Sequence, residues 1–236
     1  MKKRELLTTV LLGYLIFSGF ISCKKNDAAH KPDCKIVAAI AGANATSFTY
    51  NADGKLSSKN AATTDRFTYN GNIITITNST GATINTTTTV TLNTNGFPSN
   101  TSLVNAAGTN LSSTAFEYNG NELSKSTITS SSGGVPDVTS YNWSGGNMVS
   151  FQNGSNITTF DYALDKPAQT GDFWNLQNLS QGFETIKTKN VLKSFSSADN
   201  ITTINYSFDA SGKISGLTGI SGGAVLLALT YQYECN

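Results

Sequence analysis

A short pattern recurs along this chain and restricts its fold more than any other feature. Two aromatic residues stand two positions apart, an Asn or Asp follows, then a glycine, then an aliphatic residue. The clearest copies begin at Phe48 (FTYNADGKLS), Phe116 (FEYNGNELS) and Tyr206 (YSFDASGKIS). A repeat with a period of about 20–50 residues indicates that each copy is one supersecondary unit.

Each copy predicts a β-hairpin. Residues two apart, such as Phe48 and Tyr50, share one face of a strand. The residue between the two aromatics is polar, so we expect the aromatic face to be buried. Asn-Ala-Asp-Gly at 51–54 is a turn sequence, because glycine adopts the positive φ that tight hairpins need. An aliphatic residue such as Leu56 or Ile214 then begins the return strand.

The number of copies predicts the size of the sheet. The second anchor residues of the copies are Tyr50, Tyr69, Leu92, Tyr118, Trp143, Tyr162 and Phe208, with Tyr233 as the incoming half of a last copy. The step from Tyr162 to Phe208 is about twice the others, so we expect that one copy has decayed or been replaced. Two strands per copy predict about 14 to 16 strands of ordinary length.

The fold class predicted is all-β, an antiparallel up-and-down meander of hairpins in one domain, residues 34–236. A sheet this wide rarely stays flat, because it curls, splits or closes. We favour a curled or barrel-like meander. A two-sheet sandwich and an elongated repeat sheet remain alternatives.

One segment, residues 165–190, departs from the hairpin pattern. Pro167 is disfavoured inside a central strand, and apolar residues then recur near helical spacing at Phe173, Leu176 and Leu179. Asp172 is placed as an N-cap and Gly182 as a terminator. We therefore expect a short helix over 173–181 that plugs or caps one end of the sheet. Two roles remain open for this helix: it is a buried packing element, or it forms a binding site that uses Trp174.

The N-terminal residues predict export and lipidation. Residues 2–4 are basic, and the apolar run from Leu6 to Ile21 is shorter than the roughly 20 residues of a membrane span. Ser22 and Cys23 then resemble a bacterial lipobox. We expect residues 1–22 to be a lipoprotein signal peptide, Cys23 to carry lipid, and residues 23–33 to form a tether. The alternative is an ordinary signal peptide with an incidental cysteine.

Charge gives no indication of a nucleic-acid partner. Removal of Lys2, Lys3, Arg4 and Glu5 leaves 13 basic and 14 acidic residues. The partners expected are the membrane, through the lipid anchor, and a glycan or an envelope protein.

The other two cysteines predict a disulfide. Cys34 begins the first apolar run and Cys235 ends the last one. Because an exported protein meets an oxidising compartment, we expect the two to pair. The bridge would join the first strand to the last and stabilise the fold by up to roughly 5 kcal/mol in the chain-entropy model. The alternative is two buried free thiols.

Catalytic and metal-binding residues are not evident. The single histidine, His30, lies in the tether. The sequence therefore excludes catalytic triads that use histidine and HExxH zinc sites. Glu117 and Asp161 occupy the outward position between two anchor aromatics. We therefore predict no catalytic residue, no cofactor, no metal and no enzymatic activity.

Binding is the function class that the residues leave open. Trp143 and Trp174 are the only tryptophans and are the candidates for stacking against a sugar ring. Trp143 occupies an anchor position of the repeat, where burial is the competing interpretation. We predict a binding or structural module, with a carbohydrate-binding accessory lipoprotein as the alternative and a hydrolase as a less favoured one.

A pore-forming barrel is a further alternative, because alternating strands also describe a transmembrane barrel. The lipid anchor makes spanning unnecessary for membrane residence. The chain ends in Glu-Cys-Asn rather than an aromatic residue. Its apolar bands cover two or three residues per strand, whereas about 9–11 residues cross a bilayer.

The repeat, the lipobox and the final Tyr-x-Cys carry a family resemblance. The aromatic–x–Tyr–Asn/Asp–x–x–Gly–x–aliphatic pattern resembles the YD repeats of Rhs-type surface proteins. With Cys23 and Cys34, residues 34–235 resemble a family of Bacteroidetes-type envelope lipoproteins with a domain of unknown function described as porin-like in fold. That resemblance implies an outer-membrane location and no catalytic residues. Whether the protein faces the periplasm or the cell surface stays open, because only one acid, Asp27, follows Cys23 closely.

Overall fold

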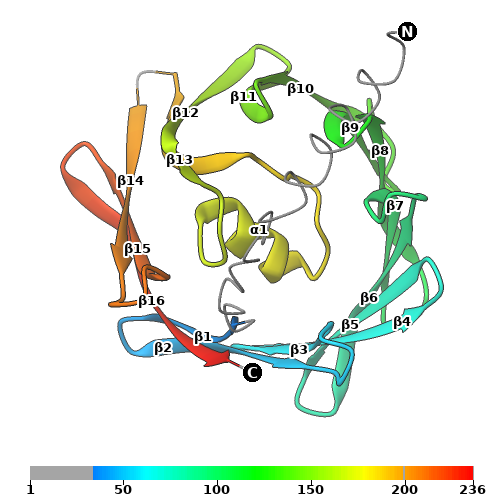
Figure 1. The fold of residues 1–236 in the computed structure, drawn as a ribbon. Helices are drawn as coiled ribbons and strands as arrows, with labels where there is room; N and C mark the ends of the chain where they lie inside the picture. The colour runs from blue at the N-terminus through cyan, green and yellow to red at the C-terminus, as the bar shows by residue number, and fades with distance from the viewer. Residues whose placement is uncertain (1–33, 199, 236) are drawn as a thin grey trace, which may run out of the picture. The chain divides into compact units, whose positions relative to one another are not determined.

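The computed structural model describes residues 34–198 and 200–235, which form a closed antiparallel barrel (Figure 1). Neighbouring strands in the barrel are neighbours in the sequence, as a meander requires. The sixteen strands are β1 (Cys34–Ala41), β2 (Asn44–Tyr50), β3 (Leu56–Asn60), β4 (Thr64–Asn70), β5 (Ile73–Thr80), β6 (Thr83–Leu92), β7 (Pro98–Asn105), β8 (Asn110–Asn119), β9 (Glu122–Ser130), β10 (Asp137–Ser144), β11 (Asn147–Asn153), β12 (Asn156–Pro167), β13 (Asn190–Ser197), β14 (Asn200–Phe208), β15 (Ile214–Ser221) and β16 (Ala224–Cys235). The all-β, barrel-like prediction is confirmed, and the sandwich and the elongated sheet are not the fold adopted.

The first and last strands close the barrel. β1 pairs with β16, with Ile36 opposite Tyr233 and Ala39 opposite Tyr231. Cys34 and Cys235 form a disulfide at the end of this pair. The copy that begins at Tyr233 is therefore complete, because β1 supplies its return strand from the other end of the chain.

The long step between Tyr162 and Phe208 corrects one expectation. We expected a decayed copy there, but β12 and β13 pair as one ordinary hairpin, with Tyr162 opposite Leu192. The extra residues lie in the turn between these strands, which contains helix α1 (Phe173–Gln181). An insertion within a turn lengthens the spacing as much as a lost copy would. The barrel thus has eight hairpins in its described residues.

The anchor aromatic residues point into the barrel, and a row of hydroxyl residues covers part of its outer face. Phe67, Ile74 and Val90 are buried on neighbouring strands. On the alternate positions, paired residues form a continuous row across β4 to β9, which we call the hydroxyl row: Thr68, Thr75, Thr89, Ser102, Ser113 and Thr129. Since successive side chains of a strand point to opposite faces, this row covers the outer surface.

In five of the eight copies, the second anchor residue links neighbouring hairpins of the described barrel. Its side chain donates a hydrogen bond to a backbone oxygen near the start of the preceding return strand; we call these bonds inter-hairpin hydrogen bonds. They join Tyr50 to Ile36 (2.6 Å), Tyr69 to Leu56 (2.9 Å), Trp143 to Leu123 (2.8 Å), Tyr162 to Met148 (2.8 Å) and Tyr233 to Ile214 (2.5 Å). This explains why the position prefers Tyr or Trp, which carry a donor, over Phe.

Helix α1 has the predicted limits and caps. The Asp172 carboxylate accepts hydrogen bonds from the backbone N–H groups of Asn175 (2.8 Å) and Gln169 (2.9 Å). Gly182 ends the helix with φ of 80°, the left-handed conformation favoured at this position. Figure 1 shows α1 inside the ring of strands, so the helix plugs the barrel. We call residues 168–189 the plug segment.

Candidate ligand-binding cavity

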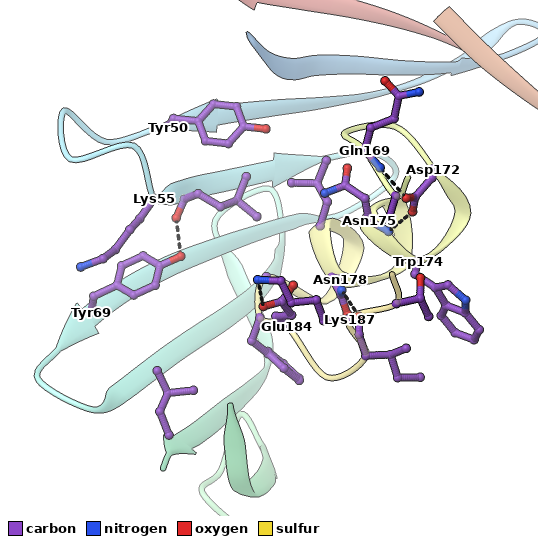
Figure 2. Close-up of a pocket in the computed structure, with 18 of the residues that line it drawn as sticks. Tyr50, Lys55, Tyr69, Gln169, Asp172, Trp174, Asn175, Asn178, Glu184 and Lys187 are labelled. Atoms are coloured by element: carbon purple, nitrogen blue, oxygen red, sulfur yellow. Dashed lines mark hydrogen bonds and ion pairs between the residues drawn. The ribbon is translucent and has the colours of Figure 1, made fainter. Parts of the chain in front are cut away.

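A cavity of about 630 Å³ separates the plug segment from one wall of the barrel (Figure 2). That volume falls within the range of small-molecule sites, roughly 300–1,000 Å³. The barrel wall contributes Tyr50, Lys55, Leu56, Tyr69, Gly71 and Leu92. The plug segment contributes the rest, among them Trp174, Asn175, Asn178, Leu179, Phe183, Glu184, Ile186, Lys187 and Lys189.

Two tyrosines are fixed on the wall of the cavity. The inter-hairpin hydrogen bonds of Tyr50 and Tyr69 hold their rings in place. Burial raises the pKa of both hydroxyls to about 12, so both remain neutral donors at physiological pH. The Lys55 ammonium lies 5.2 Å from the centre of the Tyr69 ring, and Lys35 lies 5.4 Å from that of Tyr50.

The plug segment is held in its shape by its own polar side chains. The Asn178 amide donates to the Ile186 carbonyl oxygen (2.7 Å) and accepts from the Thr185 N–H (3.1 Å). Burial raises the pKa of Asp172, although the hydrogen bonds that its carboxylate accepts from backbone N–H groups oppose that shift. The cavity therefore has a preorganised border rather than a loose loop on this side.

Two contacts join the end of α1 to the wall. Lys59 donates to the Ser180 carbonyl oxygen (2.9 Å) and pairs with Asp65 (2.7 Å), so a cation lies at the C-terminal end of the helix. Gly182 packs so closely on Phe67 that a Cβ atom there would lie 2.0 Å from the ring. These contacts hold α1 at a fixed separation from β3 and β4, and the cavity lies beside them.

The other side of the plug segment contacts β12 and β13 through aromatic packing and hydrogen bonds. The Phe160 and Trp174 ring centres are 5.4 Å apart, and those of Phe173 and Phe195 are 5.9 Å apart. Asn147 and Asn190 also exchange hydrogen bonds: the Asn147 amide donates to Asn190 Oδ1 (3.0 Å), and the Asn190 N–H donates to Asn147 Oδ1 (2.9 Å). The helix thus packs against β12 and β13 and leaves the space toward β2–β6.

Among the residues that the structure describes, three lysines and two acids line the cavity. Lys55 pairs with Asp53 (3.1 Å) and Lys187 pairs with Glu184 (3.7 Å), both in exposed positions. Among the described residues, no ion pair includes Lys189. Because Asp172 uses its oxygens to cap α1, the lining presents more positive than negative charge to a ligand.

The structure separates the two predicted tryptophans. Trp174 lines the cavity, but its indole N–H donates to the Tyr162 hydroxyl (3.3 Å) and it is buried. Trp143 makes an inter-hairpin hydrogen bond and does not line the cavity. A ligand-binding role for either residue stays a prediction. Cys23 and His30, with the predicted signal peptide and tether, lie outside the described residues.

Sequence analysis missed the wall residues of the cavity. Tyr50, Leu56, Tyr69 and Leu92 belong to the repeat, and the pattern identifies them only as inward-facing. No functional motif identified Lys55 or Lys187 as a site residue. The one signal available was the position of Lys55 directly after a turn glycine, which places a charged side chain beside the end of the barrel.

The described residues hold neither a cluster of metal ligands nor a membrane-spanning helix. Within 34–198 and 200–235, no group of three or more His, Cys, Asp or Glu side chains is arranged to hold a metal ion. In the same ranges, no helix is long and apolar enough to cross a membrane.

Comparison with known proteins shows a likeness of fold. A porin-like protein from Bacteroides uniformis has 15% sequence identity and a TM-score of 0.62, over 86% of this chain and 95% of that one. A porin-like protein from Bacteroides vulgatus has 15% identity and a TM-score of 0.59, over 86% of this chain and 99% of that one. No protein-family model matches the sequence, and no curated protein is significantly similar to it.

Proposed function

We propose that this chain is a lipid-anchored protein of the bacterial cell envelope that binds a small ligand in the cavity beside α1. The cavity carries this proposal, because it is of ligand size, is bordered by fixed side chains and lies inside a closed barrel. The porin-like neighbours support an outer-membrane or envelope location. The lipobox at Cys23 supports the anchor.

The outer surface favours binding over pore formation. A transmembrane barrel turns an apolar band toward lipid and polar residues toward its interior. Across β4–β9 the hydroxyl row covers the outside, where a transmembrane barrel carries apolar residues, while the inward face carries Phe67, Ile74 and Val90 together with Thr88 and Thr101. Two ion pairs, Glu117–Lys125 and Asp161–Lys193, also lie in exposed positions.

The cavity lies at the end of the barrel where the proposed tether arrives. Tyr50, which lines the cavity, donates to the carbonyl oxygen of Ile36, two residues after Cys34. The chain between the lipidated Cys23 and the barrel is short, at most roughly 35 Å when fully extended. An anchored barrel would therefore present the cavity end toward the membrane.

The anchor and the cavity need separate tests. Labelled palmitate should enter the intact protein and not the Cys23→Ser variant, which should leave the membrane fraction without detergent. Persistent labelling of the variant would contradict the anchor.

The binding test fills the cavity. Ala168 lines it and is partly exposed, so Ala168→Trp should occupy the space with little strain, whereas Ala115→Trp places the same side chain on the exposed outer wall. Native mass spectrometry of protein purified from envelopes should show a bound molecule in the intact protein and in Ala115→Trp, and none in Ala168→Trp. Equal occupancy in the two variants would contradict the proposed site.

A carbohydrate ligand is the second candidate, because Trp174 lines the cavity. A screen of glycans and cell-wall fragments with Trp174→Ala and Trp143→Ala tests it. Binding lost in Trp174→Ala alone, under conditions in which circular dichroism shows that the variant is folded, would favour a sugar ligand. Absence of binding by a folded, disulfide-closed protein would exclude the glycans screened.

A further inference from the structure

The lining of the cavity has two zones of different chemistry. An apolar zone faces the interior and consists of Tyr50, Leu56, Tyr69, Leu92, Leu179, Phe183 and Ile186. A charged zone, which we call the lysine group, consists of Lys55, Lys187 and Lys189. The Lys187 side chain is 67% exposed and that of Lys55 is 54% exposed, so both ammonium groups are accessible to a head group.

The charge of the lining is unbalanced toward cations. Among the described lining residues, the exposed acid is Glu184, which lies 3.7 Å from Lys187, and Lys55 pairs with Asp53 just outside the lining. Asp172 is 3% exposed, and its carboxylate accepts hydrogen bonds from two backbone N–H groups. It is therefore not oriented to receive a cationic ligand. Lys189 takes part in no ion pair among residues 34–198 and 200–235. An anion is therefore the favoured partner of this zone.

The location of the cavity favours a ligand that comes from a membrane. This step rests on the proposed function, in which the end of the barrel that holds Cys34 faces the bilayer. A molecule that leaves the bilayer there meets the lysine group at the cavity border, while the apolar zone offers its chain an apolar surface. Burial of each methylene is worth about 0.8 kcal/mol, so an apolar chain would supply most of the affinity.

We propose that the cavity binds an amphiphile with one apolar chain and an anionic head group, its chain against the Tyr50–Leu92 wall and its head group at the lysine group. A fatty acid and a phosphate-bearing lipid share this chemistry. Sugars and cationic amphiphiles do not.

The test compares head groups on one chain length. Residues 34–236 form a compact unit of their own, so protein that begins at Lys24 retains the barrel. Calorimetric titrations would use laurate, dodecyl phosphate, dodecyl maltoside and dodecyltrimethylammonium, all below their micellar concentrations. We expect the two anions to bind at least about tenfold more tightly than the maltoside, which corresponds to about 1.4 kcal/mol. Preference for laurate or for the phosphate would identify the source of the ligand.

Charge variants locate the head group. Lys187→Gln combined with Lys189→Gln should weaken laurate binding about fivefold to tenfold, since an exposed ion pair contributes up to about 1 kcal/mol. The same change should leave maltoside binding unaltered. Lys125→Gln removes a lysine from the outer wall and should leave both unaltered. A loss of maltoside binding as large as that of laurate would show general damage to the cavity and overturn the role of the lysines.

The outcomes separate this inference from the function on which it rests. Equal affinity for all four dodecyl compounds, abolished by Ala168→Trp, would overturn the anionic head group and leave a ligand cavity. No binding of any dodecyl compound, with a molecule still found in the protein from envelopes, would overturn the amphiphile and keep the proposed function. No binding and no co-purified molecule would overturn both.

Discussion

The two walls that flank α1 are built from the same repeat and have different surroundings. On the β12–β13 wall, Tyr162 is buried, and its hydroxyl also accepts a hydrogen bond from the Trp174 indole. On the β2–β6 wall, Tyr69 occupies the equivalent position and makes the same inter-hairpin hydrogen bond, yet its ring borders the cavity. An identical local motif thus serves packing in one place and a ligand surface in the other.

The cause of the difference lies in the insertion. The plug segment starts from the β12–β13 turn, so its helix lies closest to the wall from which it extends and packs there through Trp174. The opposite wall is contacted through Lys59, which donates to Ser180, and through Phe67, which packs on Gly182. Asymmetric attachment of a plug within a symmetric barrel is enough to create a cavity.

Truncation on the packed side should have the largest effect. Trp174→Ala removes a buried ring that contacts Phe160 and Phe173, and should lower the free energy of unfolding by about 3–5 kcal/mol. Leu92→Ala on the cavity side should cost about 1 kcal/mol, because that side chain is already half-exposed. Urea unfolding measures both, and similar losses would mean that the two walls are packed alike.

A methyl group at Gly182 should detach the plug from the cavity wall. Gly182→Ala places a Cβ atom against the Phe67 ring and holds alanine at positive φ, so we expect a loss of about 3 kcal/mol. Gly96→Ala is the matched control, since Gly96 also has positive φ but open space around it. The control should cost only about 1–2 kcal/mol. Equal losses in the two variants would show that contact with Phe67 contributes nothing.

Local chemistry explains which features could be predicted from the sequence. The hairpins follow from aromatic residues two apart and from turn glycines, both of which act within a few residues. The limits of α1 were predictable for the same reason, because Asp172 and Gly182 cap the helix through their immediate neighbours. The expected disulfide between Cys34 and Cys235 favoured a curled or barrel-like sheet, because it brings the first and last strands together, but it did not distinguish a closed barrel from a sandwich.

Features that depend on distant segments could not be predicted. The insertion in the β12–β13 turn was mistaken for a lost copy, since spacing alone does not distinguish the two. The hydrogen bond from the Tyr69 hydroxyl to the Leu56 carbonyl oxygen could be predicted only from the register between two hairpins, which the repeat does not encode. The cavity depends on the wall against which α1 packs, so Tyr50 and Leu92 were recognised as inward-facing without a role.

Removal of single hydroxyl groups should produce a graded series. Tyr162→Phe leaves both the Met148 carbonyl and the Trp174 indole N–H without this partner, and should cost about 1–3 kcal/mol. Tyr69→Phe removes one hydrogen bond beside the cavity and should cost about 0.5–1.5 kcal/mol. Tyr118→Phe should be close to neutral, because the buried Tyr118 hydroxyl has no hydrogen-bond partner in the described residues. Urea unfolding measures the three losses in free energy of unfolding. A different ranking of these losses would contradict the assigned role of the hydrogen bonds.

The smallest effect is a difference in how tyrosines on the two walls titrate. Burial raises the pKa of Tyr50 and Tyr69 from 10.0 to about 12, and it also raises the pKa of the more deeply buried Tyr162. An unfolded chain ionises near pH 10, so these groups stabilise the fold fully below that pH and lose this contribution as pH rises through 12. Near-ultraviolet absorbance should show Tyr50, Tyr69 and Tyr233, whose pKa burial also raises to about 12, ionising before Tyr162. Tyr50→Phe and Tyr69→Phe should each reduce the amplitude of this earlier phase. If neither variant reduces it, the cavity tyrosines do not ionise before Tyr162 and the difference between the two walls is contradicted.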